Sequence, residues 1–185
     1  MDPDSDVVAL VANGDMTGAL RQLMQRHGTS VYRYCREALH DATLADDVQQ
    51  QVFIEVFRDL QRFNGRSTLR TWLFAIAHHR VLDAAKARGR AQAHIDADDP
   101  GPVPDPRPSP AEAIDDARLH VALLSCLDKL PEQLRTVLLL RFQQGFTFEE
   151  MAVVCRERPG TLQAKVTRAL PVLRACIENR TGGTL

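Results

Sequence analysis

The sequence predicts an all-α protein with two small helical domains joined by an extended linker rich in proline and aspartate. Apolar residues recur at three- and four-residue intervals through most of the chain, which is the pattern of amphipathic helices. The pattern stops in residues 91–112, where a proline occupies every second position from Pro100 to Pro110. Successive prolines remove amide donors and forbid a helix, so this stretch predicts a chain of polyproline character.

Length and composition are typical of a soluble globular protein with one or two domains, because the chain has 185 residues, 44% of them hydrophobic and 25% charged. The formal net charge of -1 excludes a uniformly basic nucleic-acid binder, so such a function would depend on local segregation of charge. The N-terminus lacks a cationic region followed by a long apolar run, and no segment has the length needed to span a bilayer. We therefore expect a cytoplasmic protein with no membrane span.

The first part of the chain predicts two or three helices over residues 6–40, with Gly14 and Gly28 as the breaks. The next helix is expected to start at Thr43 as its N-cap, with Asp46 three residues later. Its buried stripe consists of six apolar residues: Val48, Val52, Phe53, Val56, Phe57 and Leu60.

The opposite face of this helix is polar, acidic and rich in glutamine, and it carries Asp46, Asp47, Gln49, Gln50, Gln51 and Glu55. Two interpretations stay open for this face. It is either an ordinary solvated surface or a docking surface for a basic protein partner.

The segment from Phe63 to Arg90 is the most informative part of the chain. Its apolar residues Leu69, Trp72, Leu73 and Ile76 have helical spacing. Between Arg58 and Arg90 eight cations face only two acids, Asp59 and Asp83. A packed helix would present these cations as a row that attracts a phosphate backbone, although a solvated helix surface is the alternative.

A turn with the sequence NGRST precedes this helix. Asn64 and Gly65 tolerate left-handed backbone conformations, which let a tight loop protrude. Phe63 beside them supplies an aromatic face on which an unstacked base could rest. The turn therefore indicates a loop able to hold single-stranded bases.

The proline-rich segment divides the chain into three parts: a first domain over residues 1–90, a linker over 91–112 and a second domain over 113–185. The linker is acidic, because Asp96, Asp98, Asp99, Asp105 and Glu112 outnumber Arg107. It is either a passive spacer or an acidic strand able to occupy a channel built for nucleic acid.

In the second domain, a first helix face is formed by Leu119, Leu123, Leu124, Leu127 and Leu130, and a second by Leu134, Val137, Leu138 and Phe142. Pro131 is placed to open the second of these helices, and Gly145 to end it. Thr147 followed by Glu150 has the form of a capping box that opens a short helix.

After a brief turn, a longer helix is expected from Thr161 to Asn179, which completes a helix-turn-helix arrangement. Its inward face would consist of Leu162, Val166, Leu170 and Leu173. Pro171 should kink this helix, because it removes the hydrogen bond to the Thr167 carbonyl. The outward residues expected at the major groove are Thr161, Gln163, Ala164, Lys165, Thr167 and Arg168.

The four cysteines, at positions 35, 126, 155 and 176, show neither the close pairs of a zinc site nor the density of a disulfide scaffold. We expect reduced, buried thiols.

Several motifs in order resemble the bacterial sigma-70 family of transcription initiation factors, in its extracytoplasmic-function branch. The segment at residues 45–53, ADDVQQQVF, is similar to the family's AEDLVQEVF. The run at residues 63–83, FNGRSTLRTWLFAIAHHRVLD, is similar to its F-x-G-x-S-x-L-x-T-W-L-x-x-I-A-x-N-x-x-x-D pattern. Residues 127–152 resemble the family's second domain, and PGTLQAKVTRALPVL resembles its recognition helix.

The resemblance implies two helical domains and a set of partners. The first domain would bind the clamp of the RNA polymerase core through Asp46, Asp47, Gln50 and Phe53. The second would meet the polymerase flap and read the minus-35 promoter element through the six outward helix residues given above, while the linker would lie in the RNA channel. An anti-sigma factor would hold the two domains shut, and neither cofactor, metal nor catalysis is expected.

The resemblance also implies that the first domain opens promoter DNA at the minus-ten element and captures a flipped base. Unstacking a base costs a few kcal/mol, which contacts to the melted strand would offset. The residues implied in this role are Phe63, Asn64, Gly65, Arg66, Ser67, Thr68, Arg70, Trp72, His79, Arg80, Lys86 and Arg88.

The chain departs from the family pattern at several positions. His79 stands where the family has Asn, and Gln51 replaces a common Glu. Gln163 and Ala164 replace the usual Lys and Ser. The promoter sequence that this chain recognises therefore cannot be inferred from that of other family members.

Two other classes of function compete with a sigma factor. A free helix-turn-helix regulator would bind duplex DNA tightly without polymerase. An enzyme would use His78 and His79 with Asp83 or a cysteine, but the two histidines are expected on different helix faces.

Overall fold

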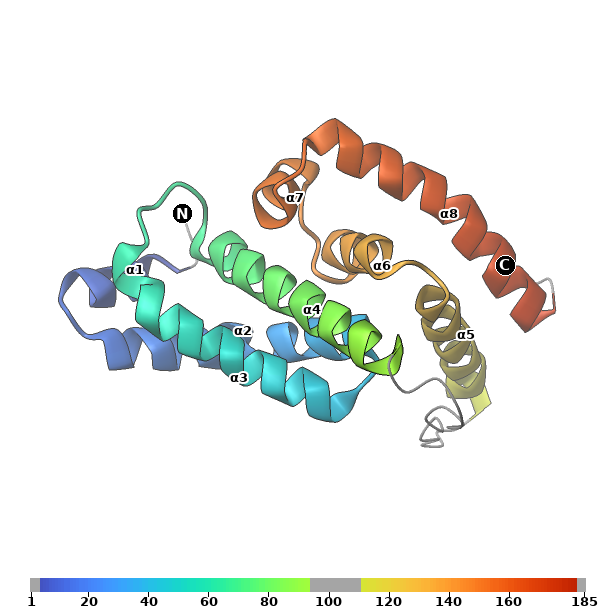
Figure 1. The fold of residues 1–185 in the computed structure, drawn as a ribbon, viewed down its shortest axis with the longest axis horizontal. Helices are drawn as coiled ribbons and strands as arrows, with labels where there is room; N and C mark the ends of the chain where they lie inside the picture. Colours follow the sequence, from blue (N-terminus) through green and yellow to red (C-terminus); the bar gives the residue numbers. More distant parts are fainter. Residues whose placement is uncertain (1–3, 94–110, 183–185) are drawn as a thin grey trace.

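The protein is helical throughout the residues that the structure, a computed structural model, describes: 4–93 and 111–182. The N-terminal unit contains α1 (Ser5–Ala12), α2 (Met16–Leu39), α3 (Ala42–Asp59), the short helix η1 (Leu60–Arg62) and α4 (Leu69–Ala93). The C-terminal unit contains α5 (Ala111–Asp128), α6 (Glu132–Leu138), η2 (Leu139–Gln143), α7 (Phe148–Cys155) and α8 (Pro159–Thr181). No strand occurs in these ranges, and the predicted all-α class with two helical domains is confirmed (Figure 1).

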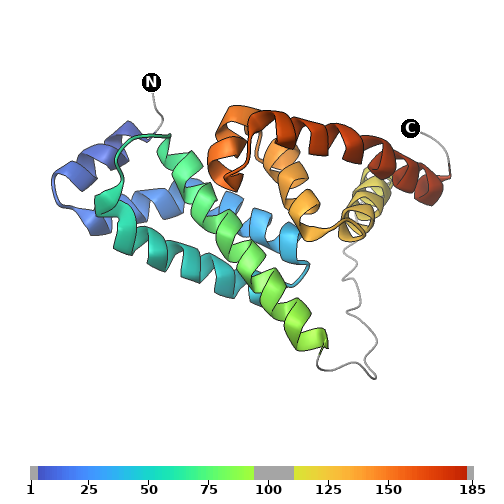
Figure 2. The same ribbon diagram turned by 45° about the horizontal axis from the view of Figure 1, so that its top comes forward.

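The core of the N-terminal unit lies between α2, α3 and α4, which pack side by side (Figures 1 and 2). Tyr34, Leu39, Val52 and Leu73 are fully buried there. The C-terminal unit buries Leu140, Phe146, Met151 and Leu162 between its helices. Apolar burial of this kind supplies most of the stability of short helices, which are marginal on their own.

Two predictions about the first helices were wrong. Gly28 does not break the chain, because it lies buried inside α2, and the side chain of Gln49 donates to its carbonyl at 2.8 Å. Tight packing against α3 offsets the low helix propensity of glycine. The N-cap of α3 is Asp41 and not Thr43, since its carboxylate accepts from the Leu44 amide at 2.9 Å.

Three residues expected on buried helix faces are exposed: Phe57 at 46%, Leu170 at 41% and Phe142 at 61%. The period of 3.6 residues does not fix on which side of a stripe such residues lie. Phe53 is 6% exposed and belongs to the core, as its place in the predicted stripe requires, so little of its surface is open to the polymerase that the resemblance assigned to it.

The helices that flank the predicted linker reach into it. α4 continues to Ala93, and α5 begins at Ala111. The rest of the predicted extended segment, residues 94–110, lies outside the described residues.

The last helix continues past its internal proline. α8 runs from Pro159 to Thr181 with Pro171 inside it (Figure 1), and the kink expected at this proline stays a prediction. Buried residues on both sides of the proline, Val166, Ala169 and Ile177, hold the helix against the rest of the unit. Their packing compensates for the one hydrogen bond that the proline removes.

A disulfide between Cys126 and Cys176 joins α5 to α8, so the expectation that all four thiols are reduced was wrong. The two cysteines are 50 residues apart in the chain, and only the fold brings them together. Cys35 and Cys155 are free thiols. Burial raises the pKa of each to about 12, which makes them poor nucleophiles.

Candidate nucleic-acid interface

A protruding loop joins η1 to α4, and it is built by local hydrogen bonds. Gly65 has a φ of +69°, a conformation that glycine adopts without strain. The side chain of Asn64 accepts from the Arg66 amide at 3.3 Å. Asn64, Gly65, Arg66 and Thr68 are exposed, as the sequence predicted for a loop that could meet single-stranded bases.

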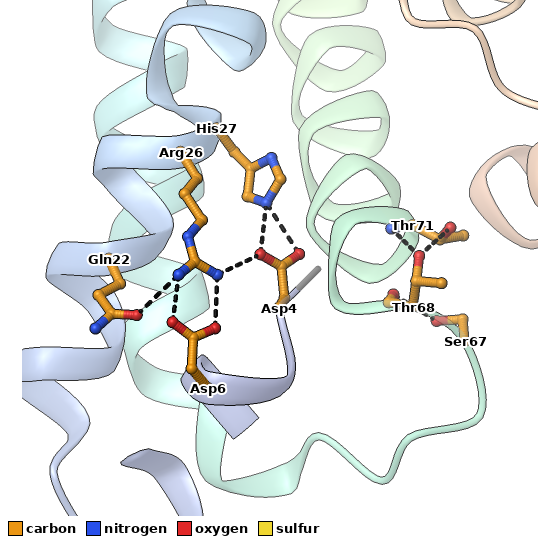
Figure 3. A network of polar contacts seen from close by, with 8 residues as sticks. All are labelled: Asp4, Asp6, Gln22, Arg26, His27, Ser67, Thr68 and Thr71. Atoms are coloured by element: carbon orange, nitrogen blue, oxygen red, sulfur yellow. Dashed lines mark hydrogen bonds and ion pairs between the residues drawn. The ribbon is translucent and has the colours of Figure 1, made fainter. Parts of the chain in front are cut away.

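The far end of this loop is fixed to the start of α4. The Thr68 hydroxyl accepts from the Thr71 amide at 3.1 Å and lies 2.8 Å from the Thr71 hydroxyl (Figure 3). Ser67 donates to the Thr68 carbonyl at 3.2 Å. These contacts cap the helix and limit the freedom of the loop at this end.

The aromatic side chain of the loop is partly covered. The Phe63 ring packs against the Trp72 ring with centroids 5.6 Å apart. Both rings are half-buried, so each keeps part of its surface open.

A polar cluster joins α1 to α2 and is drawn with the loop in Figure 3. Arg26 bridges Asp4 and Asp6, and His27 Nε2 lies 3.0 Å from an Asp4 oxygen. The hydrogen bond from Arg26 lowers the pKa of Asp6 below its usual range. The cluster ties the N-terminal helix down and was not foreseen from the sequence.

The cations predicted to bind DNA phosphates differ in the partners that their side chains have within the protein. Arg66 and Lys86 are exposed and have no side-chain partner among the described residues. Arg80 donates to Glu55 at 2.6 Å, and Arg88 donates to the Leu39 carbonyl at 2.6 Å, so both are partly occupied within the protein. Arg70 points toward the C-terminal unit and stacks on Phe146.

The two adjacent histidines face different surroundings. His78 is buried, and its Nδ1 lies 2.9 Å from the Tyr34 hydroxyl. Burial lowers the pKa of His78 to about 4, so it is neutral near pH 7. His79 is half-buried, with its Nδ1 2.7 Å from the Ala75 carbonyl.

The hypothesis of an enzyme gains no support from this pair. The Tyr34 contact gives His78 a structural role, and no hydrogen bond among the described residues joins Cys35 or Cys155 to either ring. Within residues 4–93 and 111–182, no group of three or more metal-binding side chains comes together.

The outer surface of α3 combines acidic and apolar side chains. Asp46, Asp47 and Gln50 are exposed, as predicted. Ile54 and Phe57 are also exposed, at 61% and 46%. The sequence analysis did not predict these exposed apolar side chains. Helical spacing could have indicated them, because Ile54 and Phe57 follow Gln50 on the same face of α3.

The helix-turn-helix is formed by α7 and α8. Thr147 and Glu150 make the predicted capping box: the Glu150 amide donates to the Thr147 hydroxyl at 3.2 Å, and the Thr147 amide donates to the Glu150 carboxylate at 2.8 Å. Arg156 ends α7 in a left-handed conformation with φ of 54°. Pro159 then stands in the first turn of α8, where its missing amide hydrogen costs nothing.

Five of the six residues predicted to face the major groove are exposed, and they are Thr161, Gln163, Ala164, Thr167 and Arg168. A shallow hollow lies over the first turns of α8 at this face. Lys165 differs, because its Nζ donates to both carboxylate oxygens of Glu157 at 2.7 and 2.6 Å. The charge of Lys165 is therefore paired within the turn.

An apolar groove of about 450 Å³ lies between α2 and the C-terminal unit. Leucines of α5, α6 and α8 form its floor, while Arg33, Glu37 and His120 form a polar rim. Burial raises the pKa of Glu37 above its usual range. The sequence patterns did not reveal this groove because its walls come from segments far apart in the chain.

Within residues 4–93 and 111–182, no helix is both long and apolar enough to cross a membrane.

The described residues form a helical protein of two units, the second of which contains a helix-turn-helix. Residues 23–91 match the family described as Sigma-70 region 2, and residues 120–170 match the family described as Sigma-70, region 4. The chain belongs to the sigma-70 family, in its extracytoplasmic-function branch, and it is an RNA polymerase sigma factor.

Relatives of known name extend over nearly the whole chain. RNA polymerase sigma-H factor of Pseudomonas aeruginosa is 30% identical over 173 residues, which cover 90% of this chain and 89% of the relative. ECF RNA polymerase sigma factor SigC of Mycobacterium tuberculosis is 30% identical over 178 residues, covering 95% and 94%.

Two solved structures share the fold. CnrH in complex with the cytosolic domain of CnrY has a TM-score of 0.71 and 24% identity, covering 96% of this chain and 99% of that chain. The sigma factor RpoE in complex with the anti-sigma factor NepR from Bartonella quintana has a TM-score of 0.70 and 20% identity, covering 85% and 96%.

Proposed function

We propose that the two halves of this sigma factor divide promoter recognition between them. Residues 1–90 bind the polymerase clamp and open DNA at the minus-ten element, and residues 113–185 meet the polymerase flap and read the minus-35 element. The linker, residues 91–112, connects the two halves within the polymerase. The chain carries out no catalysis of its own and acts in the cytoplasm, where polymerase and promoters are.

The observation that carries the proposal is that one chain of this family exposes both the loop before α4 and the first turns of α8. The loop of Asn64, Gly65 and Arg66 protrudes from the N-terminal unit. The first turns of α8 present Gln163, Thr167 and Arg168 from the C-terminal unit. The loop suits unpaired bases, whereas a helix N-terminus suits the major groove.

The role of the loop in promoter opening can be tested by removing the positive charge of Arg66. In complexes of core polymerase, the chain and promoter DNA, Arg66→Ala should reduce the permanganate reactivity of unpaired thymines near the start site. Arg62→Ala is the matched control, because Arg62 is an exposed arginine just outside the loop. Equal opening by both variants would contradict the role of the loop.

Polymerase binding by α3 is tested by reversing a charge. Asp47→Lys should weaken capture of core polymerase, while Asp83→Lys on α4 should not, since both aspartates are exposed but only Asp47 lies on the proposed surface. Loss of capture in both variants would indicate a general charge effect.

We also propose that an anti-sigma factor controls the chain. One solved structure of similar fold contains the sigma factor RpoE with the anti-sigma factor NepR, and another contains CnrH with the cytosolic domain of CnrY. Purification of the tagged chain from its native cells should recover a protein that blocks transcription when it is added back to the purified sigma factor and core polymerase. Repeated purification without such a protein would contradict this part of the proposal.

A further inference from the structure

Small residues stand at the centre of the outward face of α8. The shallow hollow on this face is bordered by five exposed residues, which are Gly160, Gln163, Ala164, Thr167 and Arg168. Their spacing places them on one side of the helix. On the opposite side, Leu162, Val166 and Ala169 are buried. In a helix-turn-helix, the exposed side of the second helix faces the base edges of the major groove.

The fold does not require a glycine at position 160. Gly160 lies in the first turn of α8 and does not adopt the positive φ found at Gly65 and Gly145. A Cβ atom at this position would meet no side chain and no other segment of the described residues within 4 Å. Glycine lowers the stability of a helix relative to alanine, so neither backbone conformation nor internal packing accounts for its presence. The open space in front of Gly160 is available to a molecule outside the protein.

The lysine of this helix is kept away from the hollow. Lys165 does not border it, and the Lys165 ammonium donates to both carboxylate oxygens of Glu157 at 2.7 and 2.6 Å. An ammonium at the centre of the outward face would be attracted to DNA phosphates of any sequence. With Lys165 paired in the turn before α8, the centre of the face carries no charge and suits contact with the base edges themselves.

The hydrogen-bonding groups of this face stand at the sides of the hollow. At helical spacing, Gln163 and Arg168 lie on opposite sides of the line from Gly160 to Thr167. Arg168 Nε donates to the Ala164 carbonyl at 3.2 Å, which holds the guanidinium beside the hollow and leaves its two terminal amino groups as donors. The hollow therefore has an apolar centre, formed by Gly160, Ala164 and the Thr167 methyl group, between two polar side chains.

We propose that this hollow binds the 5-methyl group of a thymine, so that the minus-35 element of this chain contains a thymine that is recognised through its methyl group. This inference rests on the proposed function, in which α8 reads the minus-35 element. Among the base edges in the major groove, the thymine methyl is the apolar group, and alanine and threonine methyl groups are its usual contacts. The thymine methyl lies in front of Gly160, against the side chains of Ala164 and Thr167.

The hollow is a property of this chain, because Ala164 stands where the family usually has serine. A serine hydroxyl covered by a thymine methyl would lose its hydrogen bond to water without gaining another. The alanine removes that cost. Position 164 therefore favours a methyl group at the place where a serine would favour a polar edge.

The test replaces thymine by uracil, which removes the methyl group and changes nothing else in the base pair. Core polymerase loaded with the full chain first selects promoters from a library randomised across the minus-35 element. Each thymine of the selected element, on either strand, is then replaced by uracil, and competition between the two duplexes for the loaded polymerase is measured. At one position the wild type should prefer thymine about fourfold, the factor that burial of one methyl-sized group contributes.

Two variants change the hollow and one serves as the matched control. Gly160→Ala places a methyl group of the protein in the hollow and should abolish the preference for thymine at that position, while the helix content stays at least that of the wild type. Ala164→Ser should also reduce the preference. Gly89→Ala on α4 is the control, because Gly89 is likewise a helical glycine whose added Cβ would meet nothing within 4 Å, and it should keep the fourfold preference.

Equal binding of thymine and uracil duplexes by the wild type at every position would overturn the inference, and so would an unchanged preference in Gly160→Ala. If Gly160→Ala weakens binding but leaves the ratio of the two affinities at four, the space admits the sugar–phosphate backbone and the inference is also wrong. In each of these cases the selected minus-35 element still stands, and with it the proposed function. A selection that yields no shared minus-35 sequence would refute the proposed function itself.

Discussion

Cutting the Cys126–Cys176 disulfide should strongly destabilise the C-terminal unit. The bond links α5 to α8 and closes a segment of 50 residues that contains α6, η2 and α7. In the chain-entropy model, a closed loop of this length contributes about 4 kcal/mol to the free energy of unfolding. This is a large share of the 5 to 15 kcal/mol typical of a whole domain.

The assay is urea unfolding with and without a reductant, followed by two probes. Circular dichroism reports both units, whereas the fluorescence of Trp72, the one tryptophan of the sequence, reports the N-terminal unit. With a urea dependence of about 2 kcal/mol per molar, reduction should lower the midpoint for the C-terminal unit by at most about 2 M. The Trp72 midpoint should move less.

The control is the double variant Cys126→Ala with Cys176→Ala. Its urea midpoint should equal that of the reduced wild type and should not change when the reductant is added. Cys35→Ala leaves the bond intact and should keep the response to reductant. If mass spectrometry confirms the bond in the oxidised sample and the midpoint is still unchanged by reduction, the stabilising role of the bond is refuted.

Three further predictions concern single side chains. Glu157→Gln should free the Lys165 ammonium to bind a DNA phosphate. In anisotropy titrations with a minus-35 duplex, the slope of log affinity against log salt concentration should then steepen by about 1. An unchanged slope would show that Lys165 does not contact DNA. The folded-state pKa of His78 is lowered from 6.5 to about 4, so the stability it contributes is present above about pH 6.5 and is lost as the pH falls toward 4. His78→Gln, which can still bind Tyr34, should flatten the dependence of the urea midpoint on pH in this range, and a profile as steep as that of the wild type would contradict the assignment. Thr147→Ala should remove the capping box and cost about 1 kcal/mol, seen as faster amide exchange at the start of α7; unchanged exchange there would argue against the cap.

Local patterns predicted the parts of this fold that depend on neighbours in the chain. The capping box of Thr147 and Glu150 was predicted because its two partners are three residues apart. The stripe of Val48, Val52 and Val56 was predicted because helical spacing places them on one face. The family and its two helical domains also followed from ordered motifs, and the comparisons confirm them.

Contacts between distant segments could not be predicted in this way. Arg70 and Arg135 look like surface cations in the sequence, yet both bind carbonyls across the unit interface. Cys126 and Cys176 are brought together only when α5 packs on α8. Lys165 was expected at the DNA face, but Glu157, in the turn before α8, pairs its charge.

The central claim is that this chain directs polymerase to specific promoters, and transcription of fragmented genomic DNA by purified core polymerase tests it most directly. With the chain present, mapped transcripts should start at discrete sites that share sequence elements near positions minus ten and minus 35. Core polymerase alone should give no such sites. The same scattered start sites with and without the chain would contradict the account.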